Sequence, residues 1–195
     1  MHVEMKGDGR RASRAVIWLV RHGRPDWPGG ALGWSDPALS AAGEAQALAA
    51  ARRLAGRPLR AVHASDLRRA LGTAERVAAP HGLPVLASAD LRELAFGPWE
   101  GRDLADLWTE QPEAARAWEA DLRRTPPDFA ESVADLERRV GRFAAGLEAA
   151  AGDVAIVAHR GSLAVLQTLL TGSDLVAVWR LGFALAEVRP LVVPC

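Results

Sequence analysis

The sequence has a single cysteine, no excess of charge of either sign and no apolar run long enough to span a membrane. Cys195 is the last residue, so no intrachain disulfide can form and a zinc site built on thiolates is excluded. The 24 basic and 24 acidic residues cancel and are interspersed, which gives no general attraction to nucleic acid or to an anionic membrane. We therefore expect a soluble, cytoplasmic protein that binds neither, and any anion site must be local.

Residues 1–14 are charged and small, and we expect them to form a flexible extension. The apolar segment AVIWLV that follows is shorter than the core of a signal peptide and has no cleavage site after it. With 195 residues, of which 49% are hydrophobic, the chain fits one ordinary domain. We expect that domain at 15–195, with a helical insertion at about 103–129.

Short apolar strands alternate with helical segments along the chain. The pattern predicts strands at 16–20, 59–65, 84–88 and 153–159, a last strand at 184–193 interrupted by Pro190, and helices at 40–56, 66–82, 132–150 and 161–172. Residues 103–124 are predicted as two helical pieces broken at Pro112, and Ser132 with Asp135 matches a capping box. This alternation is typical of an α/β fold, here a three-layer α/β/α sandwich with a largely parallel central sheet.

Three of the predicted strands end on groups that attract negative charge. Arg21 and His22 end the first, Arg69 lies one helical turn after the second, and His159 ends the third. A single such residue is usually only solvated. In an open parallel sheet, however, the carboxyl ends of the strands meet at one crevice, where helix N-termini add backbone N–H groups. The coincidence of three strand ends therefore predicts a phosphate site.

Five segments resemble the successive motifs of a known family. They are LVRHG, SDLRRALGTAE, LRELAFGPWEG, AESVADLERRV and IVAHRG, in this order between residues 15 and 190. In this respect the chain resembles the histidine phosphatase superfamily, in its phosphoglycerate mutase-like branch. The layout of FGPWEGRDLADLW and VADLERRV is also similar to that of bacterial alpha-ribazole phosphatase-like proteins.

The resemblance implies a role for each motif residue. His22 would be the nucleophile that becomes phosphohistidine, Arg21 and Arg69 would grip the phosphoryl oxygens, and His159 would be the second histidine of the phosphate pocket. Glu93 would be the general acid, and it must then be protonated, which burial or nearby phosphate charge would favour. The family is expected to use no metal and no cofactor, and its partner is a small phosphorylated substrate.

Several alternatives stay open at this stage. Glu93 could instead be an exposed loop carboxylate paired with Arg92. The short segment between Glu93 and His159 favours a phosphatase over mutase-type phosphoryl transfer, and a non-catalytic phosphate-binding scaffold would keep the same fold. Pro25, Ala130 and Arg160 depart from the family pattern and leave the choice of substrate open, with Arg160 turned either into the pocket or out to water. A homodimer is also open.

Overall fold

A five-stranded sheet forms the centre of the fold. Its strands are β1 (Val16–Arg21), β2 (Leu59–Ser65), β3 (Val85–Ser88), β4 (Asp153–Ala158) and β5 (Val188–Val192), in the order β3-β2-β4-β1-β5. The pairs β3-β2, β2-β4 and β4-β1 are parallel, and β5 is antiparallel to β1. The computed structural model describes residues 15–126, 128–147 and 152–192. The predicted extension at 1–14 and Cys195 lie outside these residues.

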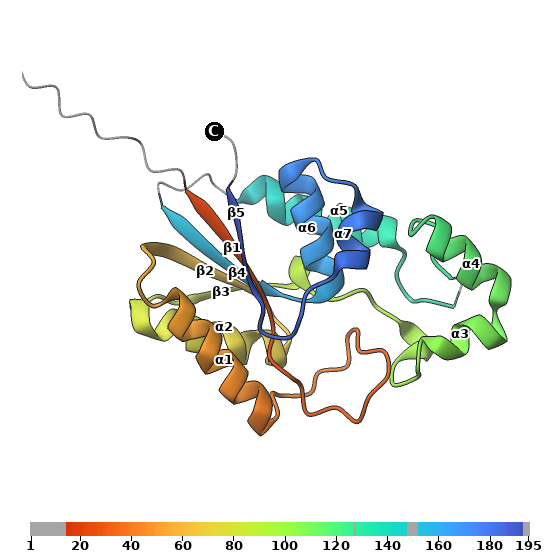
Figure 1. The fold of residues 1–195 in the computed structure, drawn as a ribbon, viewed down its shortest axis with the longest axis horizontal. Coiled ribbons are helices and arrows are strands. Elements are labelled where there is room, and N and C mark those ends of the chain that lie inside the picture. The colour runs from red at the N-terminus through yellow and green to blue at the C-terminus, as the bar shows by residue number, and fades with distance from the viewer. Residues whose placement is uncertain (1–14, 127, 148–151, 193–195) are drawn as a thin grey trace, which may run out of the picture.

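Helices cover both faces of the sheet, as Figure 1 shows. One face carries α1 (Ala41–Leu54) and α2 (Arg68–Ala78), and the other carries α5 (Val133–Gly146), α6 (Arg160–Thr171) and α7 (Leu175–Leu181). Alternate side chains of β1 enter the two layers: Trp18 and Val20 pack on the first side, and Leu19 packs on the second. The predicted α/β/α sandwich with a largely parallel sheet is confirmed.

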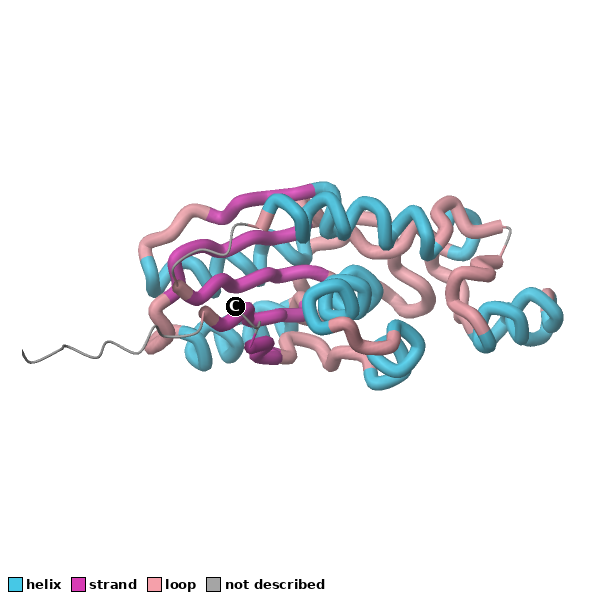
Figure 2. The backbone as a smooth tube through the Cα atoms, turned by 90° about the horizontal axis from the view of Figure 1, so that it is seen from above, coloured by secondary structure: helices cyan, strands magenta, loops and turns pink. Residues whose placement is uncertain are grey.

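Two further helices, α3 (Ala105–Glu110) and α4 (Pro112–Ala120), stand out from the sheet at the end where the parallel strands finish (Figures 1 and 2). Pro112 is the first residue of α4, so the predicted break between two helical pieces is confirmed. The three remaining pieces are short 3₁₀ turns at Ala79–His81, Ala89–Leu91 and Gly97–Trp99. Among the described residues, no helix is both long and apolar enough to cross a bilayer.

Most predicted helices and strands are confirmed near their predicted bounds, but the last strand begins at Val188 rather than at residue 184, and one helix was not predicted. The end of the helix predicted at 132–150 lies outside the described residues. The capping box of Ser132 and Asp135 is present at the start of α5. Helix α7 was not predicted, although Asp174 caps its first turn by accepting a hydrogen bond from Ala177 N. Pro190 does not interrupt β5 but lies within it, opposite Trp18. An edge strand tolerates proline because the missing N–H is not needed for pairing on its open side.

Candidate active site

The two histidines lie together because the strands that carry them are neighbours. Arg21 at the end of β1 pairs with Ala158 at the end of β4, so His22 and His159 follow at the same level of the sheet. The His22 amide donates to the Ala158 carbonyl oxygen at 3.0 Å, and the two imidazole centroids are 5.0 Å apart. The predicted convergence of these strand ends is therefore seen in the structure.

One ring nitrogen of His22 is hydrogen-bonded to the backbone, and the other is available for chemistry. Its Nδ1 lies 2.7 Å from the Gly23 carbonyl oxygen. A carbonyl oxygen only accepts, so Nδ1 carries the proton and Nε2 keeps its lone pair. Burial, followed by the charge of Arg69, lowers the pKa of His22 to about 3. The ring is consequently a neutral imidazole at neutral pH, with Nε2 available as a nucleophile.

His159 is completely buried at the start of α6. Neither of its ring nitrogens has a hydrogen-bond partner among the described residues. Burial holds the pKa of His159 well below the ordinary value, and the charges of Arg69 and Arg21 act in the same direction. Buried polar nitrogens normally have partners, so this ring is built to meet a group that the protein itself does not supply.

Arg69 and Arg21 bring fixed positive charge to the same place. Arg69 is fully buried, and its two terminal nitrogens donate to the carbonyl oxygens of Ser35 at 2.8 Å and Gly33 at 2.7 Å. Arg21 donates to the Phe183 carbonyl oxygen at 2.7 Å. The Nε atoms of both arginines are buried and have no partner in the described chain. Burial lowers the pKa of both, while the charge of Glu93 opposes that shift. Unsatisfied cationic donors of this kind fit an anion.

Glu93 faces the first turn of α6. Both of its carboxylate oxygens lie 3.1 Å from the Gly161 amide nitrogen, and Oε1 also accepts from Leu94 N at 2.9 Å. The side chain is buried, so the alternative of an exposed carboxylate paired with Arg92 is wrong. Arg92 forms a bidentate ion pair with Asp66 instead, at 2.6 and 2.7 Å.

A buried arginine that sequence reasoning missed holds the segment that carries Glu93. Arg139 of α5 pairs with Glu131 at 2.6 and 2.8 Å. It also donates to the carbonyl oxygens of Asp90, Arg92 and Glu93 at 2.9, 2.6 and 2.8 Å. A signal was available in the sequence, because position 139 continues the three-residue spacing of Val133 and Leu136 on the apolar face of α5.

Two more polar side chains fix the backbone around the arginines. Oε1 of Glu100 accepts from the amides of Gly33 at 3.0 Å and Trp34 at 2.7 Å, and so holds the turn whose carbonyl oxygens receive Arg69. The Thr73 hydroxyl accepts from Gly23 N at 3.0 Å and donates to the Arg69 carbonyl oxygen at 2.8 Å. The site is therefore held in place before any substrate arrives.

The glycine that follows His22 is required by close packing. A Cβ on Gly23 would lie 2.4 Å from the Gly43 carbonyl oxygen near the start of α1. No side chain tolerates that separation, so only glycine allows the loop to pack this closely against α1. In this position the Gly23 carbonyl oxygen accepts the hydrogen bond from His22 Nδ1.

The Arg160 side chain is bonded to the backbone of α7. It is exposed and donates to the Trp179 carbonyl oxygen in α7 at 3.1 Å. Of the two orientations considered from sequence, the structure shows the one in which the guanidinium reaches water. Its charge still acts on the neighbouring Arg21, whose pKa it helps to lower.

The described part of the chain contains no group of three or more histidine, cysteine, aspartate and glutamate side chains arranged to hold a metal ion. The predicted residues Arg21, His22, Arg69, Glu93 and His159 are buried or nearly so and lie at one edge of the sheet. Their donors suit a doubly charged oxyanion, because guanidinium and imidazole groups bind phosphate oxygens directly.

Comparisons with known proteins agree with this chemistry. A family model for the histidine phosphatase superfamily (branch 1) matches residues 17–193. The adenosylcobalamin/alpha-ribazole phosphatase of Escherichia coli K12 is 34% identical over 167 residues, which cover 84% of this chain and 82% of that protein. The glucosyl-3-phosphoglycerate phosphatase of Mycobacterium tuberculosis H37Rv is 35% identical over 172 residues, covering 82% and 76%.

A solved structure of a mycobacterial glucosyl-3-phosphoglycerate phosphatase with inorganic phosphate has a TM-score of 0.79 and 31% identity, and the match covers 90% of this chain and 88% of that one. Fold and relatives together define the protein as an α/β enzyme that hydrolyses phosphate esters. More particularly, the chain belongs to the histidine phosphatase superfamily.

Proposed function

We propose that this phosphatase hydrolyses a small phosphomonoester in two steps through a phosphohistidine on Nε2 of His22. The observation that carries the proposal is the state of His22: a neutral imidazole with its proton committed to Gly23, beside buried donors of Arg21, Arg69 and His159 that lack an acceptor. A dianionic phosphoryl group supplies that acceptor, and Nε2 supplies the electron pair that attacks phosphorus.

In the first step, the Nε2–P bond forms while the bond from phosphorus to the ester oxygen breaks. The departing oxygen takes a proton from Glu93, so the leaving group is an alcohol and Glu93 becomes a carboxylate. Arg21 and Arg69 hold the phosphoryl oxygens, and their fixed charges stabilise the transition state without reorganisation. His159 donates to a further oxygen once phosphate charge favours its protonated form.

In the second step, water attacks the phosphohistidine. Glu93, now a carboxylate, takes a proton from that water as the new P–O bond forms. The N–P bond breaks, its electron pair returns to Nε2, and inorganic phosphate leaves. His22 and Glu93 are then in their starting states, so one hard displacement has been divided into two easier ones.

Two finer points belong to the same proposal. We take the cytoplasm as the compartment, because the single cysteine and the balanced charge suit a reducing, aqueous environment. The substrate is a small phosphorylated molecule of the kind that the named relatives hydrolyse. Sedimentation equilibrium of the purified protein decides between a monomer and a homodimer.

Trapping the covalent intermediate tests the proposal. Brief exposure to a phosphomonoester labelled in its phosphoryl group, followed by an alkaline quench, is expected to leave acid-labile phosphate on His22. His22→Ala is expected to lose both label and turnover. Label on another residue, or unchanged turnover by His22→Ala, would contradict the mechanism. A phosphate-binding scaffold would give no turnover at all, and a mutase would pass the label to an added alcohol rather than to water.

A further inference from the structure

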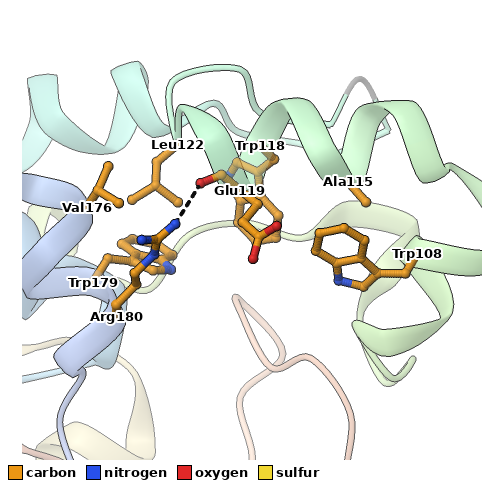
Figure 3. A pocket seen from close by; sticks show the side chains of 8 residues that line it. All are labelled: Trp108, Ala115, Trp118, Glu119, Leu122, Val176, Trp179 and Arg180. Carbon is orange, nitrogen blue, oxygen red and sulfur yellow. Dashed lines mark hydrogen bonds between the residues drawn. The ribbon is translucent and has the colours of Figure 1, made fainter.

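A small apolar cavity of about 190 Å³ lies between α4 and α7. Three indole rings line it, those of Trp108, Trp118 and Trp179, together with Ala115, Leu122 and Val176, and Glu119 and Arg180 complete the wall. Figure 3 shows Trp108 and Trp179 on opposite sides, with the side chains of α4 between them. The mechanism above uses none of these residues.

Trp179 connects this cavity to the segment that carries Gly161 and to the side chain of Glu93. A Cβ on Gly161 would lie 2.3 Å from Oε1 of Glu93 and 3.1 Å from Cη2 of Trp179, so the carboxylate and the edge of the indole both border the same backbone position at the start of α6. The same indole forms a wall of the cavity. A group that leaves from phosphorus must accept a proton from Glu93, and it therefore lies on the side of the site where Trp179 stands.

The cavity is held open by fixed neighbours. The rings of Trp118 and Trp179 meet edge to face at 6.4 Å, and Trp118 also packs edge to face on Phe129 at 5.2 Å. Arg180 Nη2 donates to the Glu119 carbonyl oxygen at 3.4 Å and links α7 to α4, as the dashed line in Figure 3 marks. A cavity with such walls is preorganised for a ligand rather than formed by it.

We propose that the cavity receives a flat aromatic part of the substrate, carried by the alcohol side of the phosphate ester. An apolar cavity of about 150 Å³ is enough to hold benzene, and pockets for drug-sized ligands begin near 300 Å³. The space between α4 and α7 therefore suits one ring system. This inference rests on the proposed function and names the class of substrate for the same site.

The test compares esters of matched leaving-group chemistry. Benzyl, phenethyl and phenylpropyl phosphate are paired with hydroxyethyl and hydroxypropyl phosphate, all esters of primary alcohols, and kcat/KM is measured for each. We expect the wild-type protein to prefer at least one phenyl ester over the hydroxyalkyl esters. The preferred linker length reports the reach from phosphorus to the cavity.

Two variants change the cavity in opposite ways. Trp108→Ala removes a half-exposed wall, and Val176→Trp fills the space. Each is expected to lower the ratio of phenyl to hydroxyalkyl kcat/KM by about fivefold, the scale of one aromatic contact. The hydroxyalkyl esters serve as the internal check on folding, because a misfolded variant loses both. Leu181→Ala, an exposed residue of α7 outside the cavity, is the matched control and leaves the ratio unchanged.

Each outcome decides a different point. Equal kcat/KM for both kinds of ester in the wild type, or a ratio that neither variant changes, would overturn the inference alone and leave the proposed function standing. No turnover of any ester would overturn the proposed function and the inference with it.

Discussion

The surroundings of His22 decide its chemistry. Removal from water and the neighbouring guanidinium of Arg69 both oppose a positive ring, so the imidazole stays neutral although it lies in an anion site. The Gly23 carbonyl oxygen then decides which nitrogen holds the proton. Arg69 and Arg21, which would bind the phosphate, therefore also keep His22 neutral and nucleophilic before the substrate binds.

Glu93→Gln is expected to discriminate between leaving groups. The amide keeps the size of the side chain but has no acidic proton to give, so alkyl phosphates should be hydrolysed about 10²-fold more slowly or worse. Nitrophenyl phosphate, whose phenolate leaves without protonation, should lose far less. Steady-state kcat/KM on both esters makes the comparison. Equal losses would mean that Glu93 only positions the substrate.

Arg160→Gly is expected to be nearly silent. The guanidinium is exposed and bonded to a backbone carbonyl of α7, and contacts of exposed charges contribute little. The change in kcat/KM should stay below about fivefold for singly and multiply charged esters alike. A loss confined to multiply charged esters would show instead that the side chain turns inward during catalysis.

At the scale of elements, the segment that carries Glu93 depends on α5. Arg139→Met removes three donors to carbonyl oxygens of this segment and leaves Glu131 as an unpaired buried charge. Breaking a buried pair in this way costs about 3–5 kcal/mol of unfolding free energy, measurable by urea denaturation.

The double variant Glu131→Leu with Arg139→Met separates folding from positioning. It removes both charges, so most of the stability should return. The carbonyl oxygens of Asp90, Arg92 and Glu93 still lack their donor, so slow hydrolysis of alkyl esters should persist while nitrophenyl phosphate is hydrolysed well. Recovery of both activities would reduce Arg139 to a purely structural role.

The elements that sequence could predict are those with a strong local signal. The buried apolar run of β1 ends in Arg21 and His22, that of β4 is followed by His159, and Ser132 begins a helix with a reciprocal cap. Each signal is visible within a few consecutive residues. Helix α7 was missed because seven residues span too few turns to show a period, even with Asp174 in front.

Contacts between distant segments left no such signal. Arg139 reaches three carbonyl oxygens more than 40 positions earlier, and Trp179 meets Trp118 across α4 and α7. Every residue has a backbone carbonyl oxygen, so the amino-acid sequence does not indicate which of these oxygens an arginine will bind. Arg21, His22, Arg69 and His159 were predicted because they follow strand ends that meet at one edge of a parallel sheet, and Glu93 was predicted only from the resemblance to family motifs. The cavity depends on how two helices pack.

At the scale of the molecule, the buried histidines couple stability to pH. The pKa of His22 is about 3 and that of His159 is also lowered, whereas both would titrate near 6.5 in the unfolded chain. Below pH 6.5 the unfolded state therefore binds more protons, and stability falls as pH falls toward 3. Between pH 6.5 and 5, His22 should cost about 1.7 kcal/mol of unfolding free energy, and His159 acts in the same direction.

Urea denaturation in phosphate-free buffer at several pH values measures this loss. His22→Gln with His159→Gln should flatten the profile between pH 5 and 6.5, because glutamine does not titrate. Added phosphate should also reduce the slope, since a bound anion favours protonated imidazole. An equally steep profile in the double variant would place the titrating groups elsewhere.

The two edge strands of the sheet limit how copies of this chain can associate. One edge strand is β3, which has only four residues, and the other is β5, in which Pro190 has no amide hydrogen to donate. A fibril or a sheet shared between molecules grows by adding strands to a long, regular border with a full row of donors. Within the described residues neither edge strand provides one, so this sheet is a poor template for adding a strand from another copy.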